Sequence, residues 1–311
     1  MQLFIQVPCL NEAGTLALAL AELPREVEGF DSVKILIIDD GSTDATAEVA
    51  LQEGADYVVR HTHNKGLASA FMTGLDACLE LGADVIVNTD ADNQYNAGDI
   101  PALVRPILDG KAEIVIGARP ISSIAHFSFA KKVLQHLGSW VVRFASATDI
   151  PDAPSGFRAI SRSAAQRLNV FNSYTYTLEM IIQAGQLNMA ITSVPVSVNE
   201  DLRPSRLFSS ISSYIRKSVI TILRIFVIYK PFKFFGTLGL GFILIGMAAI
   251  LRFLYMYATG GGDGHVQSLI LASIMLGAGF QSILFAFLAD MLAANRKLLQ
   301  DIRYRQLKDK S

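Results

Sequence analysis

Short apolar runs alternate with helical patterns through the first half of the chain. Five runs are predicted to form buried strands: Leu3–Val7, Val33–Ile38, Tyr57–Val59, Val85–Val87 and Ile114–Ile116. The segments between them favour helices at Thr15–Leu23, Thr43–Glu53, Leu67–Leu81 and Asp99–Leu108. Near-continuous apolar strands that alternate with helices are typical of an α/β fold with a mostly parallel sheet. We therefore expect such a domain, with its ligand at the carboxyl ends of the strands.

The second half of the chain is strongly apolar. Phe234–Leu251 carries no charge, and Ser268–Ala289 contains only Gln281 as a strongly polar side chain. Each segment is long enough to cross a hydrocarbon core of about 30 Å. We therefore expect two membrane spans, at about 234–256 and 267–290. Their glycines let two helices pack closely and permit a homo-oligomer.

Residues 206–233 place apolar side chains three or four positions apart, with cationic side chains on other faces. This pattern predicts an amphipathic helix that lies in the membrane interface. Its most apolar part, Val219–Tyr229, is too short to span and carries Arg224, so we do not expect it to cross. Without embedded helices after it, the same pattern would indicate an ordinary surface helix.

Basic residues on both sides of the hairpin set its expected orientation. They stand before it at Arg216, Lys217, Arg224, Lys230 and Lys233, and after it at Arg296, Lys297, Arg303, Arg305, Lys308 and Lys310. The connecting loop Ala258–Gln267 has none, and Arg252 near the outer end of its span can reach the interface. The positive-inside rule then puts both termini and the folded domain in the cytoplasm, beneath a cell or endoplasmic-type membrane. The chain also enters its first strand directly, which leaves no room for a signal peptide.

Composition bounds the domain plan and the partners. The 311 residues divide into a folded domain, a juxtamembrane helix, a hairpin and a basic tail, at 1–205, 206–233, 234–290 and 291–311. A formal net charge of −1 gives no field that would attract nucleic acid. Cys9 and Cys78, the two cysteines, are expected to be reduced core residues and not a disulfide framework.

The most informative polar segment is Asn88–Gln94, directly after the apolar run Val85–Val87. Asp90 and Asp92 lie one residue apart at a predicted strand end, where their carboxylates can hold one divalent cation. Oxygen ligands of this kind suit Mg²⁺ or Mn²⁺ and not zinc. Such an ion, shared with a diphosphate, stabilises a leaving group. The alternative is that the two acids form only a polar turn.

Two other strand ends carry acidic residues. Asp39 and Asp40 can accept hydrogen bonds from a ribose hydroxyl or a base N–H, and Gly41 permits a close turn. Glu12, after the first strand, either contacts a nucleotide or complements a helix N-terminus. Polar residues also follow the run that ends at Ile116, and the four polar strand ends together predict one site at this edge of the sheet.

The loop before the third predicted helix contains three more candidates. Lys65 is placed to meet a base or a phosphate, although a lone loop lysine is usually only solvated. His61 and His63 stand two apart and have no third ligand nearby. We therefore expect surface histidines there and not a metal site.

A set of motifs in fixed order makes the prediction more specific. In chain order they are VPCLNEAGTL, IDDGSTDAT, NKGLASAFMTGL, NTDADNQY, GAR and SGFRAISR. Together they resemble an inverting family 2 glycosyltransferase of the GT-A fold. The apolar end narrows the resemblance to polyprenyl- or dolichyl-phosphate mannosyl- and glucosyltransferases. The match covers residues 1–205 in motif detail and the whole chain in arrangement.

The resemblance implies a role for each motif residue. It makes Asp90, Asp92 and Gln94 the site of Mg²⁺ or Mn²⁺. It assigns the nucleotide to Pro8, Asn11, Glu12, Asp39, Asp40, Lys65, Asp90 and Ala91. It gives catalytic roles near the phosphates to Asp92, Asp152, Arg119 and Arg158. Asp152 would orient the acceptor or an arginine, or else cap a turn.

The resemblance also implies an acceptor site. Arg203, Ser205 and Arg206 match a family motif that often ends in Ser-Lys, so the charge is kept. The stretch after Arg119 usually carries an arginine, for which only Lys131 and Lys132 are available here. We expect Lys132 with the other three residues to bind the acceptor phosphate.

The implied activity is metal-dependent transfer of one hexose from a UDP- or GDP-hexose to a polyprenyl or dolichyl phosphate at the bilayer. A lipid monophosphate is already a nucleophile, so no histidine base or Ser/Cys triad is needed. One alternative is a processive or other membrane-bound family 2 enzyme that acts on a glycan or glycolipid, although Trp140, the only tryptophan, does not stand in a Q-x-x-R-W motif. A second is a catalytically silent protein that binds nucleotide sugars. A Rossmann dehydrogenase would need G-x-G-x-x-G after the first strand, which is absent.

Overall fold

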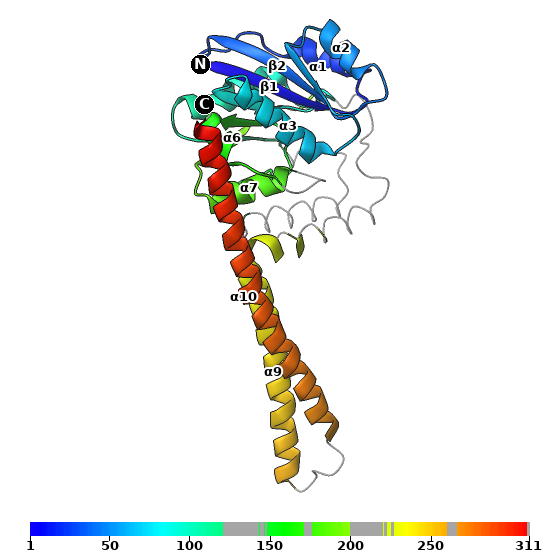
Figure 1. Ribbon diagram of the computed structural model, residues 1–311, viewed down its shortest axis with the longest axis vertical. Coiled ribbons are helices and arrows are strands. Elements are labelled where there is room, and N and C mark those ends of the chain that lie inside the picture. The colour runs from blue at the N-terminus through cyan, green and yellow to red at the C-terminus, as the bar shows by residue number, and fades with distance from the viewer. Residues whose placement is uncertain are drawn as a thin grey trace. The chain divides into compact units, whose positions relative to one another are not determined.

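The computed structural model describes residues 1–120, 143, 146, 148–170, 176–199, 220, 223–224, 227–259 and 266–309. The chain forms two compact units, Met1–Ser218 with Gln300–Ser311, and Val219–Leu299. The first is an α/β domain, and the second contains two long helices (Figure 1).

Within the described residues, seven strands form one sheet in the order β3-β2-β1-β4-β6-β5-β7. They are β1 (Gln2–Cys9), β2 (Ser32–Asp39), β3 (Tyr57–Arg60), β4 (Val85–Asn88), β5 (Ile114–Ala118), β6 (Arg158–Ser161) and β7 (Ile191–Pro195). All neighbours pair in parallel except β6, which is antiparallel to both β4 and β5. The predicted mostly parallel sheet is confirmed, and β6 and β7 are additions to it. β1, β2, β4 and β5 therefore end at one shared edge.

The helices of this domain follow the predicted alternation. α1 (Leu16–Glu22), α2 (Thr46–Gln52), α3 (Leu67–Glu80) and α4 (Ile100–Leu108) lie where four helices were expected. A short 3₁₀ turn, η1 (Ala97–Asp99), leads into α4, and α6 (Arg162–Arg167) and α7 (Thr177–Gln186) come later. α4 begins with Pro101 in its first turn, where a proline's missing N–H costs nothing.

The sheet is buried on both faces. Leu3, Ile5 and Val7 of β1 pack in one core cluster with residues of α1 and α4. On the other face α3 runs along β1 and β2 (Figure 1). A Cβ on Gly74 of α3 would collide with Gln6 Oε1 and lie 2.8 Å from Ile38 Cδ1, so only glycine permits this close approach. Each fully buried Leu, Ile or Phe stabilises the fold by about 1.5–3 kcal/mol.

The second unit contains α9 (Pro231–Ala258) and the part of α10 (Val266–Asp309) that precedes Gln300. Both are long and apolar enough to cross a membrane, and few of their residues are buried. A Cβ on Gly239 would lie 2.9 Å from the Gly279 carbonyl oxygen, and one on Gly246 would lie 3.2 Å from that of Ala272. This pairing makes the two helices an antiparallel hairpin with closely packed backbones.

The structure differs from the prediction in one segment and leaves another mostly undescribed. α10 continues as one helix to Asp309, through most of the segment expected as a basic tail. Most of the predicted amphipathic helix at 206–233 lies outside the described residues, as does most of the connecting loop.

Candidate functional site

The loop after β4 carries the three expected metal ligands at the carboxyl edge of the sheet. It turns at Asn93, whose φ of 57° is a left-handed conformation that asparagine tolerates. The Asp92 carboxylate accepts a hydrogen bond from the Gln94 N–H at 3.2 Å, and Asn199 N–H donates to the Gln94 carbonyl at 2.9 Å. Asp90, Asp92 and Gln94 are all half-buried. The fold therefore gathers them in one short, anchored loop.

The two acids of this loop repel each other. Removal from water, followed by the charge of Asp92, raises the pKa of Asp90 to about 7, against the opposing effect of Arg119 and Arg158. Among the hydrogen bonds of the described residues, none ends on the Asp90 carboxylate. A bound cation would relieve this repulsion.

This donor set fits Mg²⁺ or Mn²⁺. The part of the chain that the structure describes holds no group of three or more His, Cys, Asp or Glu side chains that could enclose an ion. Mg²⁺ is commonly held by one or two carboxylates and completes its shell with substrate phosphates. Asp90 and Asp92, with the Gln94 amide beside them, match that mode and not an all-protein cage.

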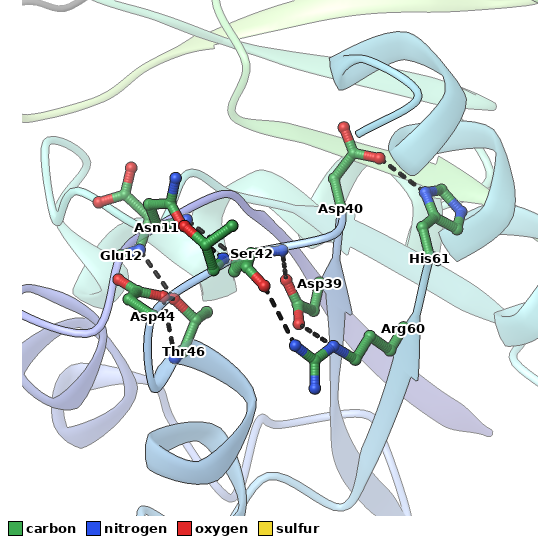
Figure 2. A network of polar contacts seen from close by, with 10 residues as sticks. Asn11, Glu12, Asp39, Asp40, Ser42, Asp44, Thr46, Arg60 and His61 are labelled. Atoms are coloured by element: carbon green, nitrogen blue, oxygen red, sulfur yellow. Dashed lines mark hydrogen bonds and ion pairs between the residues drawn. The ribbon is translucent and has the colours of Figure 1, made fainter. Parts of the chain in front are cut away.

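The loops after β1 and β2 are tied to each other (Figure 2). The Asn11 N–H donates to Ser42 Oγ and the Glu12 N–H donates to Thr46 Oγ1, both at 2.9 Å. The Glu12 carboxylate accepts a hydrogen bond of 3.0 Å from the Thr15 hydroxyl, just before α1. Asn11 and Glu12 thus sit firmly at the edge where the strands end, and Glu12 also complements the N-terminus of α1.

Asp39 is buried and holds its own loop together. Its Oδ1 accepts a hydrogen bond of 2.8 Å from the Ser42 N–H, and its Oδ2 lies 3.1 Å from Arg60 Nε. Arg60 also donates to the Ser42 carbonyl at 3.1 Å (Figure 2). The arginine at the end of β3 therefore clamps both ends of the turn after β2.

Asp40 organises the loop before α3. Its Oδ1 lies 2.7 Å from His61 Nδ1 and accepts from the Lys65 N–H, and its Oδ2 accepts from the Gly66 N–H. The prediction that His61 lies on the surface is wrong, because it is 6% exposed and its Nε2 lies 3.0 Å from Thr73 Oγ1. His63 is exposed, as expected, and so is the Lys65 side chain.

Arg119 and Asp152 form a bidentate ion pair beside the metal loop. Arg119 Nε lies 2.7 Å from Asp152 Oδ2, and Arg119 Nη2 lies 3.1 Å from Oδ1. The guanidinium also stands 5.8 Å from the centre of the Tyr95 ring. Asp152 is fully buried. Of the roles that the sequence left open, this geometry is that of a carboxylate that orients an arginine.

Arg158 lies in the interior and not at the surface of the site. It is fully buried, and its donors reach the carbonyl oxygens of Ser155, Ala153 and Thr177 at 2.7, 2.7 and 2.8 Å. Burial lowers its pKa to about 10, so it remains a cation near neutral pH. All three of these hydrogen bonds of the guanidinium go to backbone carbonyl oxygens.

The remaining expected site residues divide into two groups. Pro8 and Ala91 are buried at the ends of β1 and β4. The four acceptor candidates, Lys132, Arg203, Ser205 and Arg206, lie outside the described residues.

Sequence reasoning did not single out the buried polar groups beneath this edge. Asn88, Tyr95 and Tyr176 are each at most 4% exposed, and all three bond to the backbone of Gly156. Asn88 carried a usable signal, since a fully buried amide at the end of an apolar strand needs a partner.

Comparison with known proteins agrees with this arrangement. The model of the family described as "Glycosyl transferase family 2" matches residues 4–168. The chain is 26% identical over 235 residues to undecaprenyl-phosphate mannosyltransferase of Micrococcus luteus, covering 72% of this chain and 93% of that protein. It is 30% identical over 217 residues to the UDP-N-acetylglucosamine–dolichyl-phosphate N-acetylglucosaminyltransferase of Methanococcus voltae, covering 62% and 84%.

Solved structures share the fold. One is glucosyl-3-phosphoglycerate synthase of Mycobacterium tuberculosis in complex with Mn²⁺, uridine diphosphate and glucosyl-3-phosphoglycerate. It superposes with a TM-score of 0.57 at 19% identity, over 73% of this chain and 78% of that one. The sheet is therefore that of a GT-A glycosyltransferase, and the chain belongs to glycosyl transferase family 2.

Proposed function

We propose that this protein transfers one hexose from a UDP- or GDP-hexose to a polyprenyl or dolichyl phosphate at the cytoplasmic face of a membrane. The observation that carries the proposal is the pair of half-buried carboxylates, Asp90 and Asp92, open at the shared strand edge. The activities for which the two relatives are named support a lipid phosphate acceptor, and one of these names includes a UDP-linked sugar. The two apolar helices give such an enzyme access to a lipid substrate.

The donor would lie along the edge built by β1, β2 and β4. Asn11, Glu12 and the backbone of the β2 loop lie at this edge, and the exposed Lys65 follows in the loop that Asp40 organises. Asp90, Asp92 and Gln94 would hold Mg²⁺ or Mn²⁺, which supplies charge stabilisation for a departing diphosphate.

The reaction needs positioning more than proton transfer. A lipid monophosphate, with a second pKa of about 6, arrives largely as a dianion. One of its oxygens forms the new bond to the anomeric carbon, while the bond from that carbon to the diphosphate oxygen breaks and its electrons leave with the nucleotide. This single in-line displacement inverts the anomeric configuration. Arg119, held by Asp152, contributes a fixed positive charge beside the phosphates.

A panel of labelled donors tests this proposal with purified protein, a polyprenyl phosphate and Mn²⁺. We expect at least one UDP- or GDP-hexose to yield label that extracts into chloroform. Asp92→Asn should lower this transfer by about 100-fold or more. Asp109→Asn is the control and should keep the activity, because within the described residues this carboxylate forms ion pairs with Arg105 and Lys111 alone. Water-soluble product with every donor would contradict the lipid acceptor.

The acceptor assignment is tested separately. Arg203→Ala and Arg206→Ala should each raise the concentration of lipid phosphate needed for half-maximal rate more than that of nucleotide sugar. Steady-state kinetics with both substrates varied checks this expectation. A larger effect on the nucleotide sugar would contradict the role of these arginines.

A further inference from the structure

The segment Ser155–Arg158 lies directly against the metal loop. A Cβ on Gly156 would lie 2.8 Å from Asp90 Oδ2 and 2.9 Å from Asp90 Oδ1. Real Cβ atoms do not approach other atoms so closely. The Asp90 carboxylate therefore rests on the bare Cα of Gly156, and any side chain at this position would displace one or the other.

Gly156 is itself fixed on both sides of its peptide unit. Its N–H donates to Tyr95 Oη at 2.9 Å. Its carbonyl accepts from Asn88 Nδ2 at 2.9 Å and from Tyr176 Oη at 3.3 Å. Asn88 in turn accepts a hydrogen bond of 2.9 Å from Gln6 Nε2. These partners come from β1, β4, the metal loop and the start of α7, so the glycine has almost no freedom to move.

Arg158 secures the same turn from beneath. Its guanidinium bonds the carbonyls of Ala153 and Ser155 on one side and that of Thr177 on the other, and lies 5.6 Å from the centre of the Tyr176 ring. No carboxylate hydrogen-bonds to it among the described residues. A buried cation without a paired anion is costly. The turn that Arg158 holds carries Gly156, against which the Asp90 carboxylate rests.

We propose that Gly156 and Arg158 are positioning residues for divalent-cation binding: together they form a rigid, positively charged support that fixes the Asp90 carboxylate. This inference deepens the proposed function and rests on it. Arg158 then acts through the turn that it holds, and does not touch a substrate phosphate.

Binding of Mn²⁺ alone, followed by the electron paramagnetic resonance signal of the free ion, tests the proposal without any turnover. Gly156→Ala should weaken Mn²⁺ binding by about tenfold or more, the usual cost of disturbing the support of a metal ligand. Gly29→Ala is the matched control, because its new Cβ would lie 2.8 Å from the Leu108 side chain and meets no residue of the site. It should lower the melting temperature comparably and leave Mn²⁺ binding unchanged.

Arg158 is tested by two variants in the same assay. Arg158→Met removes the charge and should weaken Mn²⁺ binding by about tenfold or more, whereas Arg158→Lys keeps the charge and should recover part of the loss. An arginine that bound substrate phosphate would instead leave binding of Mn²⁺ alone unchanged in both variants. That result would overturn the proposal for Arg158.

The possible outcomes distinguish failure of this inference from failure of the proposed function. If the wild-type protein binds Mn²⁺ and Asp92→Asn abolishes that binding, the metal site stands. Equal binding by Gly156→Ala and wild type would then overturn the supporting role alone. If the wild-type protein shows no binding that depends on Asp92, the metal-dependent function and the inference both fall.

Discussion

At the scale of single residues, ion pairs between buried or partly buried side chains fix the charged groups of this site. Arg119 and Asp152 form a bidentate ion pair in which the Asp152 carboxylate is fully buried. Removing one partner of a buried ion pair leaves the other uncompensated and typically costs about 3–5 kcal/mol.

Asp152→Ala should therefore destabilise the protein strongly and also slow transfer, because Arg119 loses its orientation. The double variant Asp152→Ala with Arg119→Met should regain part of the lost stability, since no unpaired charge is left. Thermal unfolding of the purified variants measures both effects. A double variant no more stable than Asp152→Ala would show that the pair does not act as a unit.

The His61–Asp40 contact gives a second prediction at this scale. His61→Ala removes a buried hydrogen-bond partner of Asp40 and should lower stability by about 1–3 kcal/mol. His63→Ala, at an exposed position two residues away, should change stability by less than about 0.5 kcal/mol. Melting temperatures compared side by side check this, and equal shifts would mean that the buried contact contributes nothing.

The residue pattern predicted that the acids lie at the strand edge, and it predicted little of their neighbours. Asp90 and Asp92 could be found because two acids after an apolar strand are visible locally. Arg158 could be found as a motif residue, but its burial depends on two carbonyls of the turn before it and on that of Thr177, 19 residues away, which one sequence does not reveal. His61 was misplaced for the same reason, because its partner Asp40 comes from another strand end.

At the scale of elements, local pattern was sufficient where an apolar run is continuous. The first five strands and four helices were predicted because their apolar runs and helical periods are unbroken. β6 was missed because Arg158 and Ser161 interrupt its apolar pattern, and its antiparallel place between β4 and β5 is a non-local choice. β7 is an edge strand, only partly buried, and carries a weaker apolar signal.

The hairpin gives a prediction about helix packing. Gly239→Leu places a side chain against the Gly279 carbonyl and Ile283, so it should force α9 and α10 apart. Gly241→Leu is the matched control, because nothing lies within 4 Å of a Cβ there. We expect only Gly239→Leu to lower the melting temperature of the detergent-purified protein. Equal loss in both variants would contradict close packing at Gly239.

At the scale of the whole molecule, the proposed orientation places the α9–α10 loop outside. The native cysteines, Cys9 and Cys78, are buried, so an introduced cysteine can report alone. In intact cells, Gly262→Cys should react with a membrane-impermeant maleimide, whereas Glu53→Cys on the exposed surface of the folded domain should react only after lysis. The reverse pattern would contradict the positive-inside assignment.

The central claim is that a divalent ion held by Asp90 and Asp92 supports sugar transfer to a lipid phosphate. The most direct measurement is the yield of chloroform-extractable labelled sugar from the purified protein as EDTA is added and Mn²⁺ is then restored. We predict that EDTA abolishes this yield, that Mn²⁺ restores it in the wild-type protein, and that Mn²⁺ does not restore it in Asp92→Asn. Lipid glycosylation that continues undiminished in EDTA would contradict the account.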